Sequence, residues 1–206
     1  MRSTVHLFNI ALARLGGEQL PLNISPQEDD ATGTLCENLF PHVLDLALAA
    51  HEWGFAKRRV VLAQLPALEP ASSEYRLRYA LPKDCIKPVR IDGYGGINRS
   101  PVYIAEADGI LTNEEQAVFV YVARITDPRK WPPPFVDALA WGLAGELASA
   151  RLNDSAKQQW CYQNYRVAMA DAIVSDLSDQ NPHSVRSPWS EARGTGYWQF
   201  SDGRKL

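Results

Sequence analysis

Histidines and cysteines are the side chains of this chain most able to act as bases, nucleophiles or metal ligands. They are His6, His42, His51, His183, Cys36, Cys85 and Cys161. Neither set shows the short paired spacing of a zinc site, such as two histidines one helical turn apart. His51 and Glu52 are neighbours, and neighbouring residues of a helix do not share a face. The pattern predicts no metal centre and no bound cofactor.

Catalytic motifs are equally sparse. Cys85 and a distant histidine could be argued as a nucleophile and base, but any chain with a few of each offers such a pair. No GxSxG elbow, phosphate-binding loop or dinucleotide fingerprint occurs. The 24 carboxylates could include an acid/base pair for glycoside cleavage, although sequence cannot set the distance between two of them. We expect a protein that is not an enzyme, with a muralytic enzyme, which cleaves cell-wall glycans, as the alternative.

Aromatic and basic residues alternate in YRLRYALP at 75–82, as they would on a surface that stacks nucleic-acid bases. A half-exposed strand, with packed tyrosines and solvated arginines, explains the same pattern. The net charge of −3 also argues against a nucleic-acid-binding module, because such domains are usually clearly basic. That function remains a second alternative.

The composition is that of an ordinary folded protein, but the charge is distributed unevenly along the chain. The 206 residues are 46% hydrophobic, enough for one domain or two small ones. Residues 181–206 carry four basic and two acidic side chains, so this tail is +2 and the remainder is −5. No stretch approaches the roughly 18 apolar residues of a membrane span. Three well-separated cysteines predict buried thiols rather than a disulfide framework.

The N-terminal third has helical spacing. Val5, Phe8, Leu12 and Leu15 recur at steps of three and four, and Gly16-Gly17 supplies a left-handed stop. A second helix is expected to start at Ser25 with a capping box to Glu28. Its apolar stripe comprises Leu35, Leu39, Val43, Leu46, Ala50 and Trp53. Pro41 interrupts this stripe and predicts a kink or short break.

The middle of the chain changes to a strand period. Strands are expected within 57–65, 75–82, 85–91, 101–105 and 117–125. The segments 107–109 and 112–116 resemble turns, and the glycine-rich 93–100 resembles a hairpin connection. Tyr75, Leu77 and Tyr79 would share one face of their strand.

Helical spacing returns after Asp127-Pro128. Phe135, Leu139, Leu143 and Leu147 recur every four residues behind prolines suited to a first helical turn. Asn153-Asp154 is expected to cap a last helix, whose packed face would hold Trp160, Val167, Val174 and Leu177. The order predicts an α+β fold: an antiparallel bundle of about four helices with an inserted β-rich region and an extended C-terminal tail. The expected divisions are 1–54, 55–126, 127–180 and 181–206.

Four segments, in this order, give the chain a resemblance to a known family. They are NIALARLGGEQL, HEWGFAKRRVVLAQL, YRLRYALPKDC and DPRKWPPPFVDALAWGLAGELA. Over roughly residues 7–178 the chain resembles the tail tubular protein A family, the head-to-tail adaptor proteins of short-tailed bacteriophages. Pro41 and the polar tail depart from this match.

The resemblance implies a structural virion protein without enzymatic activity, assembled in the host cytoplasm. Copies would form a ring, typically of twelve, between the portal of the capsid and the tail nozzle. The genome would leave through the channel of this ring without being specifically bound. The resemblance also implies a helical bundle with a β-rich insertion, which agrees with the spacing of the residues.

Two sets of residues are the predicted sites. Trp53, Gly54 and Phe55 would form a structural junction where helix becomes strand. The two aromatic rings would fill the end of the core between the helices. Gly54 would permit the change of direction. Lys57, Arg58 and Arg59 would face water or a neighbouring subunit. In the tail, the candidate contacts to the portal or to a neighbouring subunit are Trp189, Arg193, Tyr197, Trp198 and Phe200.

Overall fold

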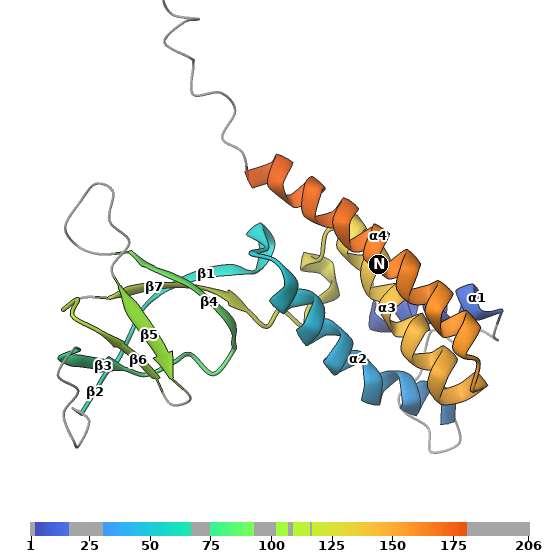
Figure 1. Ribbon diagram of the computed structural model, residues 1–206, viewed down its shortest axis with the longest axis horizontal. Coiled ribbons are helices and arrows are strands. Elements are labelled where there is room, and N and C mark those ends of the chain that lie inside the picture. Colours follow the sequence, from blue (N-terminus) through green and yellow to red (C-terminus); the bar gives the residue numbers. More distant parts are fainter. Residues whose placement is uncertain are drawn as a thin grey trace, which may run out of the picture.

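The computed structural model describes residues 3–16, 31–66, 75–92, 102–106, 109–115 and 117–180. Four helices gather at one end of the molecule and two antiparallel sheets at the other (Figure 1). The helices are α1 (Thr4–Leu15), α2 (Ala31–Ala50), α3 (Pro133–Leu152) and α4 (Ser155–Gln180). The fold class is therefore α+β, as the sequence predicts.

The strands divide into two sheets. One has the order β1 (Lys57–Val61), β7 (Val118–Ala123), β4 (Cys85–Asp92), and the other β2 (Gln64–Leu65), β3 (Leu77–Tyr79), β6 (Gly109–Thr112), β5 (Tyr103–Glu106). All neighbouring strands are antiparallel, and β4 has two register shifts along β7. Short 3-10 turns, η1 (Gly54–Ala56) and η2 (Pro128–Lys130), stand where the chain enters and leaves these sheets.

α1 and α3 form where the sequence predicts helices. Ser3 caps α1 by accepting from the backbone N–H of His6, and Gly16 ends it with a φ of 73°. All four predicted core residues of α3, Phe135 to Leu147, are fully buried. α3 lies centrally, packing against α1, α2 and most extensively α4. Most of the buried apolar side chains of the helices and of both sheets belong to one continuous cluster.

α2 corrects two predictions. The helix continues through Pro41, so of the predicted kink or short break the break is absent. Its buried residues are Cys36, Phe40, Val43, Leu44, Ala47 and Leu48. Leu46, placed in the core by its spacing, is instead 54% exposed. The buried stripe is displaced around the helix because α2 contacts both α3 and the β4–β7 sheet. The spacing of apolar residues does not specify on which side these partners lie.

α4 corrects a third prediction. Asp154 accepts from the backbone N–H of Lys157 and Asn153 adopts a φ of 48°, so the predicted cap is confirmed. The predicted packed face, however, faces solvent: Val167 and Val174 are each 64% exposed. The face that packs holds Cys161, Ala168, Met169, Ala172 and Asp176. On the α3 side, Gly142 and Gly145 leave room for the rings of Tyr165 and Tyr162 of α4, which favours this face of α4 for packing.

β6 was not predicted. Gly109–Thr112 overlaps the ends of the two predicted turns, 107–109 and 112–116, yet all four of its residues are buried. A Cβ at Gly109 would lie 2.4 Å from the carbonyl oxygen of Tyr79. Glycine therefore lets two backbones approach closely here. The predicted Ser25 cap and the predicted hairpin connection at 93–100 lie outside the described residues.

Candidate functional site

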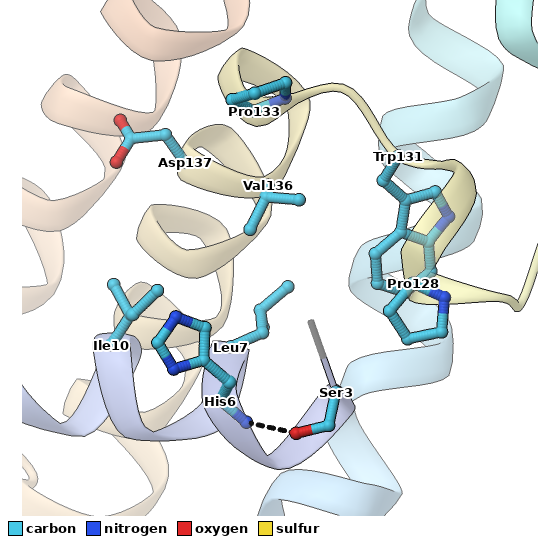
Figure 2. Close-up of a pocket in the computed structure, with 9 residues that line it drawn as sticks. All are labelled: Ser3, His6, Leu7, Ile10, Pro128, Trp131, Pro133, Val136 and Asp137. Atoms are coloured by element: carbon cyan, nitrogen blue, oxygen red, sulfur yellow. Dashed lines mark hydrogen bonds between the residues drawn. The ribbon is translucent and has the colours of Figure 1, made fainter. Parts of the chain in front are cut away.

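A hollow of about 160 Å³ between α1 and the start of α3 brings Ser3, His6 and Asp137 together (Figure 2). These are the residue types of a hydrolase triad. Ser3 Oγ, however, accepts from the backbone N–H of His6 at 3.2 Å, as a helix cap. The carboxylate of Asp137 pairs with Arg14. Among the described residues no hydrogen bond joins the His6 imidazole to either partner, so this set is not arranged as a nucleophile and base.

Arg14 is a packing residue beside this hollow. Its guanidinium stands 4.0 Å from the ring centroid of Trp141, and it also donates to the backbone carbonyl of Asp137 at 3.0 Å. Burial lowers the pKa of Arg14, and the Asp137 carboxylate opposes that effect. Trp141 in turn makes an edge contact with Trp160, at 5.1 Å between centroids. The group fastens α1 to α3 and α4.

The cysteines are structural. Cys36 and Cys161 are fully buried and Cys85 is partly buried. Burial, followed by the nearby charge of Asp84, raises the pKa of the Cys85 thiol to about 11. A thiol with that pKa stays protonated at neutral pH and is a poor nucleophile. Within the described ranges no group of three or more His, Cys, Asp or Glu side chains could hold a metal ion.

In YRLRYALP at 75–82, Tyr79 lies inside the protein. Tyr79 is 2% exposed, and its hydroxyl donates to the backbone carbonyls of Glu114 and Glu115 at 2.7 and 2.9 Å. A ring held in this way cannot stack on a nucleic-acid base.

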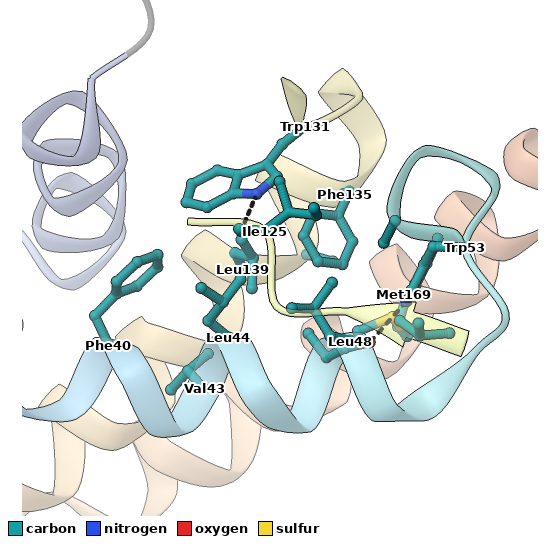
Figure 3. Packing of buried hydrophobic residues seen from close by; sticks show 14 of the residues in the cluster. Phe40, Val43, Leu44, Leu48, Trp53, Ile125, Trp131, Phe135, Leu139 and Met169 are labelled. Carbon is teal, nitrogen blue, oxygen red and sulfur yellow. Dashed lines mark hydrogen bonds between the residues drawn. The ribbon is translucent and has the colours of Figure 1, made fainter. Parts of the chain in front are cut away.

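Two buried tryptophans hold the crossings between helices and sheets (Figure 3). Where the chain leaves α2, Trp53 Nε1 donates to the carbonyl of Ala47 at 2.9 Å. Where it returns from β7, Trp131 Nε1 donates to the carbonyl of Ile125, also at 2.9 Å. In each case the acceptor lies six residues before the indole. Each Trp therefore folds back over its own crossing and satisfies one backbone carbonyl there.

Phe135, at the start of α3, lies between these two crossings. Its ring centroid is 4.9 Å from that of Trp53 and 6.4 Å from that of Trp131. Phe55 is partly buried and lies 4.9 Å from the same ring. The structure thus places two of the three predicted junction residues against a helix that begins about eighty positions further along the chain.

Gly54 has a different role from the one predicted. Its φ is not positive, so conformational freedom is not the reason for glycine. A Cβ there would lie 3.0 Å from Gln180 Cγ and 3.3 Å from Asp176 Oδ1. Glycine permits the C-terminal end of α4 to approach the junction.

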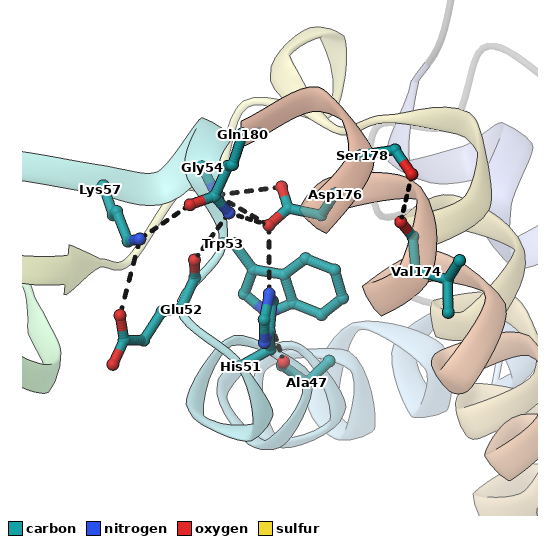
Figure 4. A network of polar contacts seen from close by, with 10 residues as sticks. All are labelled: Ala47, His51, Glu52, Trp53, Gly54, Lys57, Val174, Asp176, Ser178 and Gln180. Carbon is teal, nitrogen blue, oxygen red and sulfur yellow. Dashed lines mark hydrogen bonds and ion pairs between the residues drawn. The ribbon is translucent and has the colours of Figure 1, made fainter. Parts of the chain in front are cut away.

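Asp176 is the polar centre of this contact (Figure 4). Its side chain is 7% exposed and accepts from the backbone N–H of Gly54 at 3.0 and 3.2 Å. His51 Nε2 lies 3.2 Å from the same carboxylate, and Gln180 Nε2 also contacts it. A buried carboxylate lowers stability unless it is paired. Here His51 and Gly54, beside the junction, and Gln180, in the last turn of α4, provide the pairing. No sequence motif marks Asp176; its only signal is a carboxylate on an otherwise apolar helix face.

Gln180 extends the contact to the first strand. It donates to the Glu52 carbonyl at 3.1 Å and accepts from Lys57 Nζ at 2.8 Å. The two basic residues that follow Lys57 form ion pairs within the strand region. Arg58 pairs with Asp84 at 2.7 Å, and Arg59 pairs with Asp92 at 3.5 Å. Both arginines remain largely exposed.

Asp84 joins the strands at their helix-proximal end. Besides Arg58, its carboxylate accepts from the hydroxyl of Tyr121 at 3.0 Å, and its backbone carbonyl accepts from the N–H of Arg124 at 2.8 Å. One residue therefore links the start of β4 to β1 and β7. Asp84 belongs to the Leu-Pro-x-Asp-Cys corner singled out in the sequence.

The predicted tail contacts, Trp189, Arg193, Tyr197, Trp198 and Phe200, lie outside the described residues. None of the described helices is both long and apolar enough to cross a membrane. No protein-family model matches the chain, and no curated protein matches its sequence.

Proposed function

We propose that this protein is a structural virion component: a head-to-tail adaptor of a short-tailed bacteriophage. Copies form a dodecameric ring between the portal and the tail nozzle, around the channel through which the genome is ejected. In this proposal the four helices are an antiparallel bundle, the sheets are an insertion in it, and residues 181–206 are an extended tail. The protein is assembled in the host cytoplasm, becomes part of the virion neck and performs no catalysis.

One observation carries the proposal. The segments that resemble the adaptor family supply two tryptophans that hold the crossings between helices and sheets and an aspartate that joins the strand ends beside them. Trp53 comes from HEWGFAKRRV, Asp84 from YRLRYALPKDC and Trp131 from DPRKWPPPF. A subunit that transmits position between two large rings needs such a stiff connection between its parts, whereas none of these residues is disposed for chemistry. The resemblance is thus concentrated where a mechanical role would require it.

The charge distribution supports the same proposal. The chain outside the tail is −5, and like charge discourages DNA from adhering to a channel wall. The tail is +2 and holds four large aromatic residues, the residue types that dominate binding energy at interfaces. We place these residues against the portal or a neighbouring subunit, with Arg193 adding charge complementarity.

The tail proposal is tested by deleting residues 182–206. The deleted chain should keep the unfolding midpoint of the full chain but lose binding to the portal protein of the same phage genome. The matched variant replaces Trp189, Tyr197, Trp198 and Phe200 by alanine in the full-length chain and should lose binding equally. Unchanged portal binding by either protein would contradict the anchor role.

A further inference from the structure

α4 carries two apolar faces, and among the described residues the outer face makes an aromatic contact within the chain only at Trp160, against Trp141 of α3. The inner face packs on α3 through Cys161, Ala168, Met169 and Ala172. The outer apolar residues are Trp160, Val167, Val174 and Leu177, which are 45, 64, 64 and 52% exposed. At about 100° per residue, the centre of the outer face lies roughly opposite that of the inner face. A surface helix normally needs one apolar face only.

The outer face has the spacing of a coiled-coil seam. Its successive positions are Trp160, Gln163, Val167, Ala170, Val174 and Leu177, at alternating steps of three and four. In heptad terms Trp160, Val167 and Val174 occupy a positions, and Leu177 occupies a d position. Such a seam is complementary to another helix crossing at a small angle. β-branched residues at a with leucine at d favour two parallel helices.

The charges beside the seam specify the partner. Arg166 stands at a g position and Asp171 at the following e position. Two parallel copies bring each Arg166 beside Asp171 of the other copy, whereas antiparallel copies bring like charges together. Neither residue forms an ion pair within the part of the chain that the structure describes. We propose that the outer face of α4 binds the same face of a second copy of this protein, with the two helices parallel.

The seam is available without further folding. α4 is already held by α3, so pairing does not incur the cost of forming a helix. Figure 1 shows α4 along the outer edge of the helical part, away from the sheets for most of its length. A two-fold contact of this kind uses the same surface on both copies and closes on itself. It is therefore independent of the ring proposed above, which needs a different, head-to-tail contact.

Charge reversal in the full-length chain tests the pairing. Arg166→Asp and Asp171→Arg each place like charges across the seam, and each should weaken the dimer about tenfold in sedimentation velocity. Mixed in equal amounts, the two variants should form heterodimers at least as stable as the unmodified dimer, because both contacts become attractive. Asp179→Arg, on the same helix but outside the seam, should leave dimerisation unchanged.

A cysteine pair tests the orientation. Val174→Cys should form an intermolecular disulfide under mild oxidation, since parallel a positions face one another at a suitable separation. The neighbouring Ser175→Cys points away from the seam and should not. A full-length chain that stays monomeric at all concentrations would overturn the proposal, as would charge variants that fail to recover when mixed. Cross-linking of the Ser175 variant to the same extent as the Val174 variant would overturn the parallel arrangement.

Discussion

The carboxylate of Asp176 accepts two hydrogen bonds from the backbone N–H of Gly54, at 3.0 and 3.2 Å, across 122 positions of the chain. This contact fastens the last turns of α4 to the point where α2 gives way to the first strand. Because the segment after Gln180 continues from α4, the same contact fixes where the proposed portal-binding tail begins relative to the β part. Stability and function should therefore both depend on it.

Replacing Asp176 by alanine should lower the free energy of unfolding by about 1–3 kcal/mol. The Gly54 N–H would lose its acceptor, and a hydrogen bond to a charged group contributes more to stability than one between neutral groups. Chemical denaturation measures the change. Asp179→Ala, an exposed carboxylate on the same helix turn, is the matched control and should stay within about 0.5 kcal/mol. Equal effects of the two substitutions would refute a special role for Asp176.

Gly54→Ala should destabilise the protein through a clash with α4. The new methyl group would meet Gln180 Cγ at 3.0 Å, closer than normal contact, and overpacking of this kind costs about 1–3 kcal/mol. The cost should shrink in a Gln180→Ala background, where Cγ is absent. A double-mutant cycle measures this coupling. Strictly additive effects would show that the conformation of Gly54, not its contact with Gln180, requires glycine.

Trp53→Ala should destabilise the isolated subunit by about 3–5 kcal/mol, since it removes a buried ring from the core. Trp53→Phe retains most of that burial but leaves the Ala47 carbonyl without its donor, and should cost about 1 kcal/mol. Trp160→Ala, at a half-exposed indole, should cost less than Trp53→Ala. Thermal unfolding compares the three variants, and an unchanged midpoint for Trp53→Ala would refute its place in the junction.

Tyr162 should make the protein sensitive to alkaline pH. Burial, and then the hydrogen bond to Glu146 at 2.7 Å, raise the pKa of its hydroxyl from 10.0 to about 12. The unfolded chain ionises this group first, so its contribution is complete below about pH 10 and is lost as pH rises towards 12. Tyr162→Phe should flatten the fall of unfolding free energy between these pH values. An identical alkaline profile for the variant would contradict the assignment.

The sequence predicted those elements that are set by local chemistry. Gly16 ends α1 and Asp154 starts α4 because capping needs only neighbouring backbone groups. Phe135 and its partners at steps of four are buried because α3 lies among the other three helices and is apolar on most sides. The face of α4 was predicted wrongly because that helix has two apolar faces, and the glycines of α3 that accommodate Tyr162 and Tyr165 favour the inner one.

Contacts between distant segments could not be predicted from spacing. The partners of Asp176 lie more than 120 positions away, so nothing near it in the sequence marks it as buried. Gly54 was recognised as a junction residue, but glycine is needed there because α4, from the other end of the chain, packs against it. β6 escaped prediction because its four residues are too few to display a period of two.

The adaptor role is tested most directly by light scattering on a size-exclusion column, with the protein alone and then mixed with the portal ring of the same phage genome. The account predicts a complex with the mass of the portal plus many copies of this chain, even if the free protein is smaller than a ring. No association at any salt concentration would contradict it. Muralytic activity and salt-sensitive DNA binding would then be the assays to make.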